Sequence, residues 1–218
     1  PLFITYGVEE ALTLALSHRV AVNDGAELVF DQTETLCAID VNSSRQMGKA
    51  GRGPRDINLS VVKEIARQLR LRSIGGAIVI DALKMNRAND RNQVLESLRN
   101  YISGDPSTSH VLGISNLGLI EMTRTRIGST LAERMLEPPN TQILRSDVAA
   151  YNVIRHLLSE SRVNPSASYV LRISPEVELI LTEKLNIVFI EAASKIGRVK
   201  LQAMQNWSSD RCELIPIN

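Results

Sequence analysis

The sequence has 218 residues, of which 44% are hydrophobic, so it is long enough for one large domain or for a medium and a small one. Its formal net charge of +1 excludes any argument for nucleic-acid binding from overall charge, and only local basic segments could supply one. No apolar run approaches the roughly 20 residues that span a bilayer. Cys37 and Cys212 form no Cys-x-x-Cys pair, which favours free thiols in a reducing cytoplasm over a disulfide framework or a zinc site.

The first part of the chain is predicted to alternate strands and helices. The predicted elements are a helix over 8–17, a hairpin over 26–42, a helix over 58–72, a strand over 77–80, a helix over 89–102 and a strand over 110–114. Asn58 is the predicted N-cap of its helix, and Gly75-Gly76 the predicted stop. Residues 46–55, rich in Gly, Lys and Arg, are expected to form an exposed loop. This alternation predicts a layered α/β domain over residues 1–135.

A linker and a smaller α/β unit are predicted to follow. Residues 136–145 contain Pro138-Pro139, which is typical of a linker. The predicted elements beyond it are a helix over 146–161, a strand over 168–173, a helix over 175–184, a strand over 186–192 and a strand over 200–204. The second predicted domain therefore covers residues 146–218.

Two aspartates lie at the ends of predicted strands. Alternation places Asp40 and Asn42 on one face of the strand over 35–42, and Asp81 directly follows an apolar run. A carboxylate at the end of a buried strand costs free energy unless it is paired, hydrogen-bonded or metal-bound. Mg²⁺ prefers one or two carboxylates and keeps several waters, which leaves positions for phosphate oxygens. Convergence of Asp40 and Asp81 on one cation is one interpretation, and strand-capping or turn-forming roles are the alternative.

Basic residues are candidates for holding RNA phosphates, an interaction that would make binding depend on salt. The candidates are Arg45, Lys49, Arg52, Arg67, Arg70, Arg124 and Arg126. For any one of them, a position on a solvated helix face is the alternative. Aromatic residues make up only 4% of the chain, which argues against extensive base stacking.

Three segments resemble the ribonuclease E/G family. Residues 33–43, with the pattern Ala-Ile-Asp-x-Asn, are similar to the family's catalytic strand. Residues 58–81, which include Arg-Gln-Leu-Arg-Leu-Arg and end at Asp81, resemble the helix and strand that follow it. Residues 113–124 resemble the next block of the family, and weaker similarity extends over nearly the whole chain.

The resemblance implies a Mg²⁺-dependent endoribonuclease of RNA processing or decay, which cuts single-stranded RNA and leaves a 5′-phosphate. It implies a DNase-I-like, ribonuclease-H-like mixed-sheet subdomain followed by a small α/β domain. By position, Asp40 and Asp81 would ligate Mg²⁺, and Asn42 would orient the attacking water or the scissile phosphate. The implied partner is single-stranded RNA, with no membrane, and the implied compartment is the cytoplasm.

The chain also departs from the family's pattern. Its linker lacks the Cys-Pro-x-Cys segment that many members carry, so a homodimer would form without the zinc link. Lys84 stands where a second acid is common, and residues 106–108 replace residues that are often basic. The family's S1-type domain and 5′-end sensor lie upstream of the matching region. A catalytically weak or inactive relative that binds RNA or a protein, and a DNA-directed nuclease of similar fold, are the alternative functions.

Overall fold

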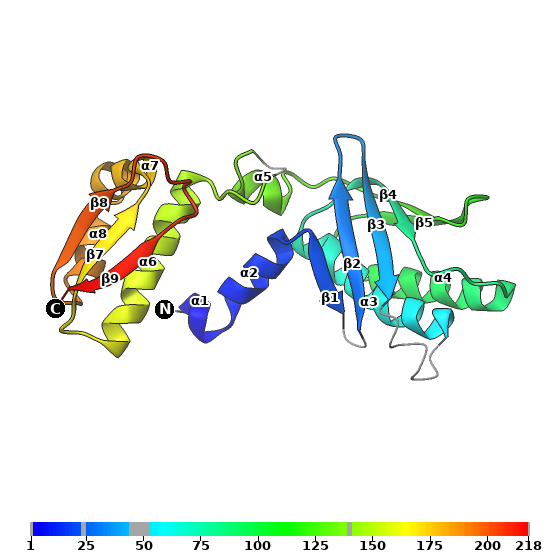
Figure 1. Ribbon diagram of the computed structural model, residues 1–218. Helices are drawn as coiled ribbons and strands as arrows, with labels where there is room; N and C mark the ends of the chain where they lie inside the picture. The colour runs from blue at the N-terminus through cyan, green and yellow to red at the C-terminus, as the bar shows by residue number, and fades with distance from the viewer. Residues whose placement is uncertain (1, 23–24, 44–52, 139–140, 218) are drawn as a thin grey trace. The chain divides into compact units, whose positions relative to one another are not determined.

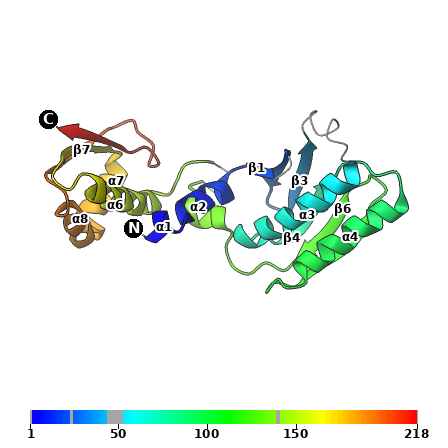
Figure 2. The same ribbon diagram turned by 90° about the horizontal axis from the view of Figure 1, so that it is seen from below.

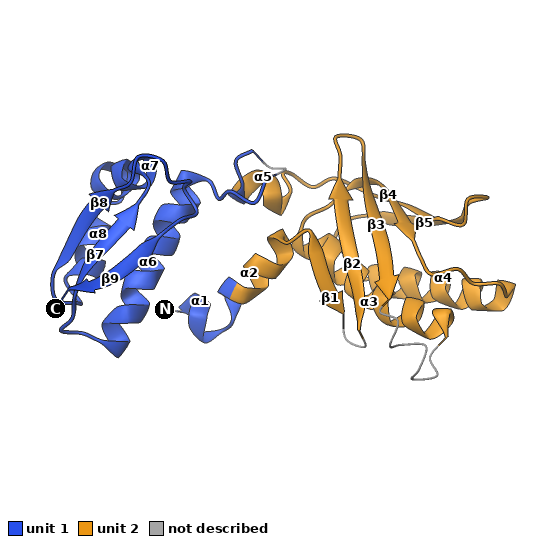
Figure 3. Cartoon of the chain, viewed as in Figure 1, with its two compact units in different colours: residues 1–9, 135–218 blue, residues 10–134 orange. Residues whose placement is uncertain are grey.

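The computed structural model describes residues 2–22, 25–43, 53–138 and 141–217. The chain divides into two compact units, one of residues 10–134 and the other of residues 1–9 together with 135–218 (Figure 3). The predicted α/β class is confirmed, because one unit holds a six-stranded mixed sheet and the other a three-stranded sheet. Among the described residues, no helix combines the length and apolar character that a bilayer crossing needs.

The sheet of unit 10–134 has one parallel pair at its centre (Figure 1). Its strand order is β1 (Arg19–Val22), β2 (Ala26–Gln32), β3 (Leu36–Ser43), β4 (Gly76–Asp81), β6 (Ile120–Arg124) and β5 (Ser109–Ile114). Only β3 and β4 run parallel among these described pairs, and all the others are antiparallel. A parallel pair needs a crossover connection, which here contains α3 (Pro54–Leu71).

Two helices cover one face of this sheet and leave the other face more accessible. Figure 2 shows α3 and α4 (Ala88–Ile102) side by side across the strands. Alternation in β3 buries Cys37, Ile39 and Val41 in the core, and Asp40 lies on the opposite face. Each fully buried aliphatic side chain stabilises the fold by about 1.5–3 kcal/mol.

Helix α3 starts four residues before its predicted N-terminus. Gly53 is the N-cap and Pro54 occupies the first turn, where its missing N–H costs nothing. Asn58 is therefore inside the helix and not its cap, which corrects the prediction. The helix ends at Leu71, before the predicted glycine stop, and Ser73 then takes the positive φ of 53°.

The second unit packs its helices on a three-stranded sheet with the order β8 (Val199–Ala203), β7 (Ser168–Ile173) and β9 (Glu213–Ile217). The helices are α6 (Ser146–Val163), α7 (Pro175–Leu179), the π-helix η2 (Ile180–Lys184) and α8 (Asn186–Ala193). The short helices α1 (Leu2–Thr5), α2 (Val8–Leu16) and α5 (Leu131–Met135) complete the described elements.

The prediction of a strand over 186–192 was wrong, because these residues form helix α8. A short apolar run fits either a strand or a buried helix, so periodicity alone does not decide between them. The backbone N–H of Phe189 donates to the carbonyl of Leu185 at 2.8 Å, which continues the helical turns that begin at α7. Strands β1 and β9 and helices α1 and α5 were not predicted.

Candidate active site

The parallel pairing of β3 and β4 sets Asp40 beside Asp81. The two residues are partners in the strand register, on strands that lie about 4.8 Å apart. Ile39 and Ile80, the preceding residues, are buried towards the helices, so both aspartates lie on the opposite face. Asp40 is half-buried and Asp81 is exposed. The fold therefore brings together the two carboxylates that the sequence singled out.

Asn42 lies on the same face as Asp40, two residues further along β3. Its side-chain Nδ2 donates a hydrogen bond to Oδ2 of Asp40 at 2.7 Å. This contact orients the Asp40 carboxylate and uses one lone pair of one of its oxygens. The predicted role of Asn42 towards water or phosphate stays a prediction, while the contact to Asp40 is an interaction that the sequence did not indicate.

Asn58 is a residue whose part in this site the sequence analysis missed. Its side chain is 0% exposed. Its Nδ2 donates to the Leu83 carbonyl at 2.8 Å, and its Oδ1 accepts from the Leu83 N–H at 3.0 Å. Leu83 lies two residues beyond Asp81, so this pair of hydrogen bonds fixes the chain as it leaves β4. The sequence did carry a signal, because the Asn58 amide lies next to an apolar helix face. A polar group buried there would need hydrogen-bond partners.

Two of the predicted RNA-binding arginines lie on α3, in the helical layer. Nη1 of Arg67 is 2.8 Å from Oε1 of Glu64, and Nη1 of Arg70 donates to the Tyr101 carbonyl at 3.1 Å. Both side chains are exposed. Because α3 packs on the face opposite Asp40, the fold does not bring these two arginines to the carboxylate pair (Figure 2).

Arg124 is buried and held by other groups of the protein. Its Nε and Nη2 each lie 2.9 Å from an oxygen of Asp105, and its Nη1 donates to the Ile74 carbonyl at 2.6 Å. Burial raises the pKa of Asp105, but the hydrogen bonds from Arg124 and from the Ser107 N–H outweigh this and the net pKa is lowered. Arg124 pairs with Gly76 at the start of β4, the end away from Asp81.

Arg126 makes contacts at the same end of the sheet. Its guanidinium donates to the Gly75 carbonyl at 3.3 Å and to the Glu34 carbonyl at 3.2 Å. A Cβ on Gly75 would come within 2.8 Å of the Arg126 Cα, so only glycine fits there without a shift. Arg45, Lys49 and Arg52 lie outside the described residues.

The chemistry of the two carboxylates fits Mg²⁺ better than a structural metal. Among the described residues, no group of three or more His, Cys, Asp or Glu side chains is arranged to hold a metal ion. A structural zinc site needs four protein ligands, whereas Mg²⁺ is commonly held by one or two carboxylates and keeps several waters. Asp40 and Asp81 are thus the residues that could hold Mg²⁺.

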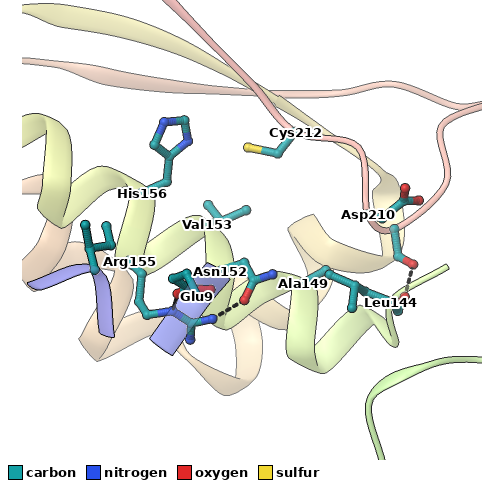
Figure 4. A pocket seen from close by; sticks show the side chains of 11 residues that line it. Glu9, Leu144, Ala149, Asn152, Val153, Arg155, His156, Asp210 and Cys212 are labelled. Carbon is teal, nitrogen blue, oxygen red and sulfur yellow. Dashed lines mark hydrogen bonds and ion pairs between the residues drawn. The ribbon is translucent and has the colours of Figure 1, made fainter. Parts of the chain in front are cut away.

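A separate pocket of about 250 Å³ lies within the second unit (Figure 4). His156 and Cys212 border it, but burial raises the pKa of Cys212 to about 11, so its sulfur is a thiol at neutral pH and a poor nucleophile. At its base, Arg155 donates to Glu9 and to Asn152. These contacts attach the N-terminal residues to α6, which gives the pocket wall a structural role.

Fold and site together define an α/β protein whose two central parallel strands place a pair of carboxylates side by side, an arrangement suited to metal-assisted hydrolysis. Residues 1–127 match the model of the Ribonuclease E/G family. The chain belongs to this family, which confirms the resemblance found in its sequence.

Named relatives match far more than the three motifs. Ribonuclease G of Haemophilus influenzae is 31% identical over 224 residues, and Ribonuclease G of Escherichia coli K12 is 28% identical over 223. Each match covers 99% of this chain and 46% of the relative, so the chain spans about half the length of these proteins. The chloroplastic Ribonuclease E/G-like protein of Arabidopsis thaliana is 37% identical over 142 residues, covering 63% of this chain and 14% of its own length.

Proposed function

We propose that this chain is the catalytic part of a Mg²⁺-dependent endoribonuclease that cleaves single-stranded RNA. The observation that carries the proposal is the in-register pairing of Asp40 with Asp81 in a member of the ribonuclease E/G family. Relatives over its full length are named Ribonuclease G, which supports RNA as the substrate and phosphodiester hydrolysis as the reaction.

Each residue of the site has a separate part in this reaction. Asp40 and Asp81 hold the metal, which when bound lowers the pKa of water and stabilises charge on the phosphate. Asn42 keeps the Asp40 carboxylate in one orientation through its 2.7 Å hydrogen bond. Asn58 holds the segment after Asp81 and so limits the movement of the second ligand. Positioning of this kind is needed because small displacements of catalytic groups are costly.

The substrate's phosphates are proposed to bind at the same strand ends. Lys84 and Arg87 are exposed and follow Asp81 by three and six residues. Arg45, Lys49 and Arg52 occupy the sequence between β3 and α3. Cations there would bind phosphate oxygens and position the backbone of the RNA without reading its sequence.

Cleavage of a 5′-labelled, A/U-rich single-stranded RNA tests this function. With Mg²⁺, the parent chain should cut the RNA, and Asp81→Asn should slow cutting by about 100-fold or more, because it removes a metal ligand. Asp90→Asn, on helix α4 in the opposite layer, is the matched control and should cut at the parent rate. Equal cutting by Asp81→Asn and the parent would refute the assignment.

The same assay separates the alternatives. RNA binding without cutting, by both the parent and the control, would favour a non-catalytic relative that serves as a binding module. Equal cutting of a DNA strand of the same sequence would favour a nuclease that does not select the sugar.

A further inference from the structure

The three-stranded sheet of the second unit has an outer face that its helices do not pack against. Tyr169, Leu171 and Ile173 of β7 are buried towards α6, α7 and α8, which lie together on one side of the strands in Figure 2. Alternation and register place the following residues on the outer face: Ser168, Val170, Arg172, Lys200, Gln202, Glu213, Ile215 and Ile217. Lys200, Gln202 and Ile217 are exposed, and the other five are half-buried.

A row of hydrogen-bonding side chains crosses this outer face. Arg172 is the register partner of both Gln202 and Glu213, on the strands to either side. Its Nε donates to Oε1 of Gln202 at 3.0 Å, and Glu213 accepts from Nη2 of Arg211 at 2.9 Å. The row therefore presents an amide, a guanidinium and a carboxylate in sequence, the groups that pair with the edges of unpaired bases.

An aromatic ring adjoins the end of this row. The Arg211 guanidinium lies 4.0 Å from the centroid of the Trp207 ring, and Arg211 also contacts Glu213 of the row. Trp207 is half-buried and Arg211 is exposed, so the stacked pair remains accessible at the surface. Tryptophan rings and arginine guanidinium planes are the groups on which proteins stack bases of single strands.

Charge within the second unit is segregated between its two sides. The outer face and the residues that adjoin it carry four cations, Arg172, Arg198, Lys200 and Arg211, against the single carboxylate of Glu213. The elements α7, η2 and α8 on the opposite side carry the glutamates Glu176, Glu178, Glu183 and Glu191 against the single lysine Lys184. The charges therefore favour a polyanion on the sheet side over the side formed by α7, η2 and α8.

We propose that the outer face, with the Trp207–Arg211 pair, binds single-stranded RNA as a second contact surface, in the other unit from the one that holds Asp40 and Asp81. Bases stack on the Trp207–Arg211 pair and lie over Val170 and Ile215, while Lys200 and its cationic neighbours bind phosphates. This inference rests on the proposed function in one respect, that the ligand is RNA. It requires neither the metal nor cleavage.

Trp207 is the only tryptophan of the chain, so its fluorescence reports on this surface alone. A ten-residue oligouridine is titrated into the full chain in EDTA, where no cleavage takes place. The expected result is saturable quenching of the Trp207 emission. Lys200→Glu should raise the Kd from this titration about tenfold or more and reduce the dependence of this Kd on salt. Lys184→Glu, a matched change on η2, should leave both unchanged.

A second measurement does not depend on tryptophan emission. The anisotropy of a labelled oligouridine should show about tenfold weaker binding to Trp207→Ala, whose circular dichroism spectrum should match that of the parent. RNA binding that leaves Trp207 emission unchanged would overturn the proposal. Equally weakened RNA binding by Lys184→Glu and Lys200→Glu would overturn it too. So would a decrease of Trp207 emission with protein concentration in the absence of RNA, because this would assign the face to a second copy of the chain.

The two proposals can fail separately. Asp81→Asn should lose cleavage and keep the parent's titration in EDTA. If Asp81→Asn instead cuts normally, the proposed active site fails while the titration still decides about the outer face.

Discussion

The buried amide of Asn58 joins the helical layer to the strand end that carries Asp81. Its side-chain N–H and carbonyl groups both hydrogen-bond to the backbone of Leu83, and the residue is fully buried. The sequence singled out Asn58 as a helix N-cap, because an Asn near the start of a helix usually has that role. In the structure it instead lies inside the helix. Only the packing of α3 against the sheet shows that this amide is enclosed.

Asn58→Ala should lower the free energy of unfolding by about 1–3 kcal/mol, since it removes the partner of the N–H and carbonyl of the half-buried Leu83. Urea denaturation followed by circular dichroism measures this. Asn92→Ala, an exposed change on α4, is the control and should stay within about 0.5 kcal/mol of the parent. A loss for Asn58→Ala as small as that of the control would contradict the positioning role.

Arg124 shows how a basic residue in a plausible motif can be structural. Removing it would leave the Asp105 carboxylate buried without its partner, so Arg124→Ala should destabilise the fold by about 3–5 kcal/mol. Arg67→Ala breaks a more exposed ion pair with Glu64 and should cost at most about 1 kcal/mol. Equal losses of unfolding free energy for Arg124→Ala and Arg67→Ala, measured by thermal or urea unfolding, would show that the buried Arg124–Asp105 pair stabilises the fold no more than the exposed one.

Strand β3 and helix α8 show what sequence patterns decide at the scale of an element. Alternation in β3 predicted which side chains share a face, and the structure agrees and shows which of the two faces is buried. Helix α8 is apolar on several sides, with Phe189 buried and Ile187 and Ile190 exposed, so its residues carry no clear period. Its helical state follows from its continuity with α7 and η2.

Ile190→Pro tests the regular hydrogen-bonded backbone of α8 at an exposed position. Ile190 is 59% exposed, so truncation to alanine should change stability little. Proline removes a helical hydrogen bond and clashes with the preceding turn, which should cost about 3 kcal/mol or more. Comparison of the melting temperatures of the two variants measures the difference, and equal melting temperatures would argue against a helix at this position.

For the whole molecule, the sequence motifs singled out a candidate pair of carboxylates, whereas the net charge pointed to no site. The net charge of +1 gave no indication of RNA, yet the sheet side of the second unit has an excess of cations, and the side of α7, η2 and α8 has an excess of acids. The pairing of Asp40 with Asp81 could be expected from two strand ends, but their register could not, because it depends on long-range pairing across α3. The grouping of residues 1–9 with 135–218 has no local signal either.

Asp40 and Asp81 are proposed to hold one and the same metal ion. The most direct measurement is the rate of RNA cleavage with Mg²⁺ for Asp40→Asn, Asp81→Asn and the double variant. If both residues hold the same ion, each single change should cost about 100-fold or more, and the double variant should lose no more than the worse single one, because residues that act as a unit are not additive. Losses that multiply in the double variant, or full activity in either single one, would contradict the account.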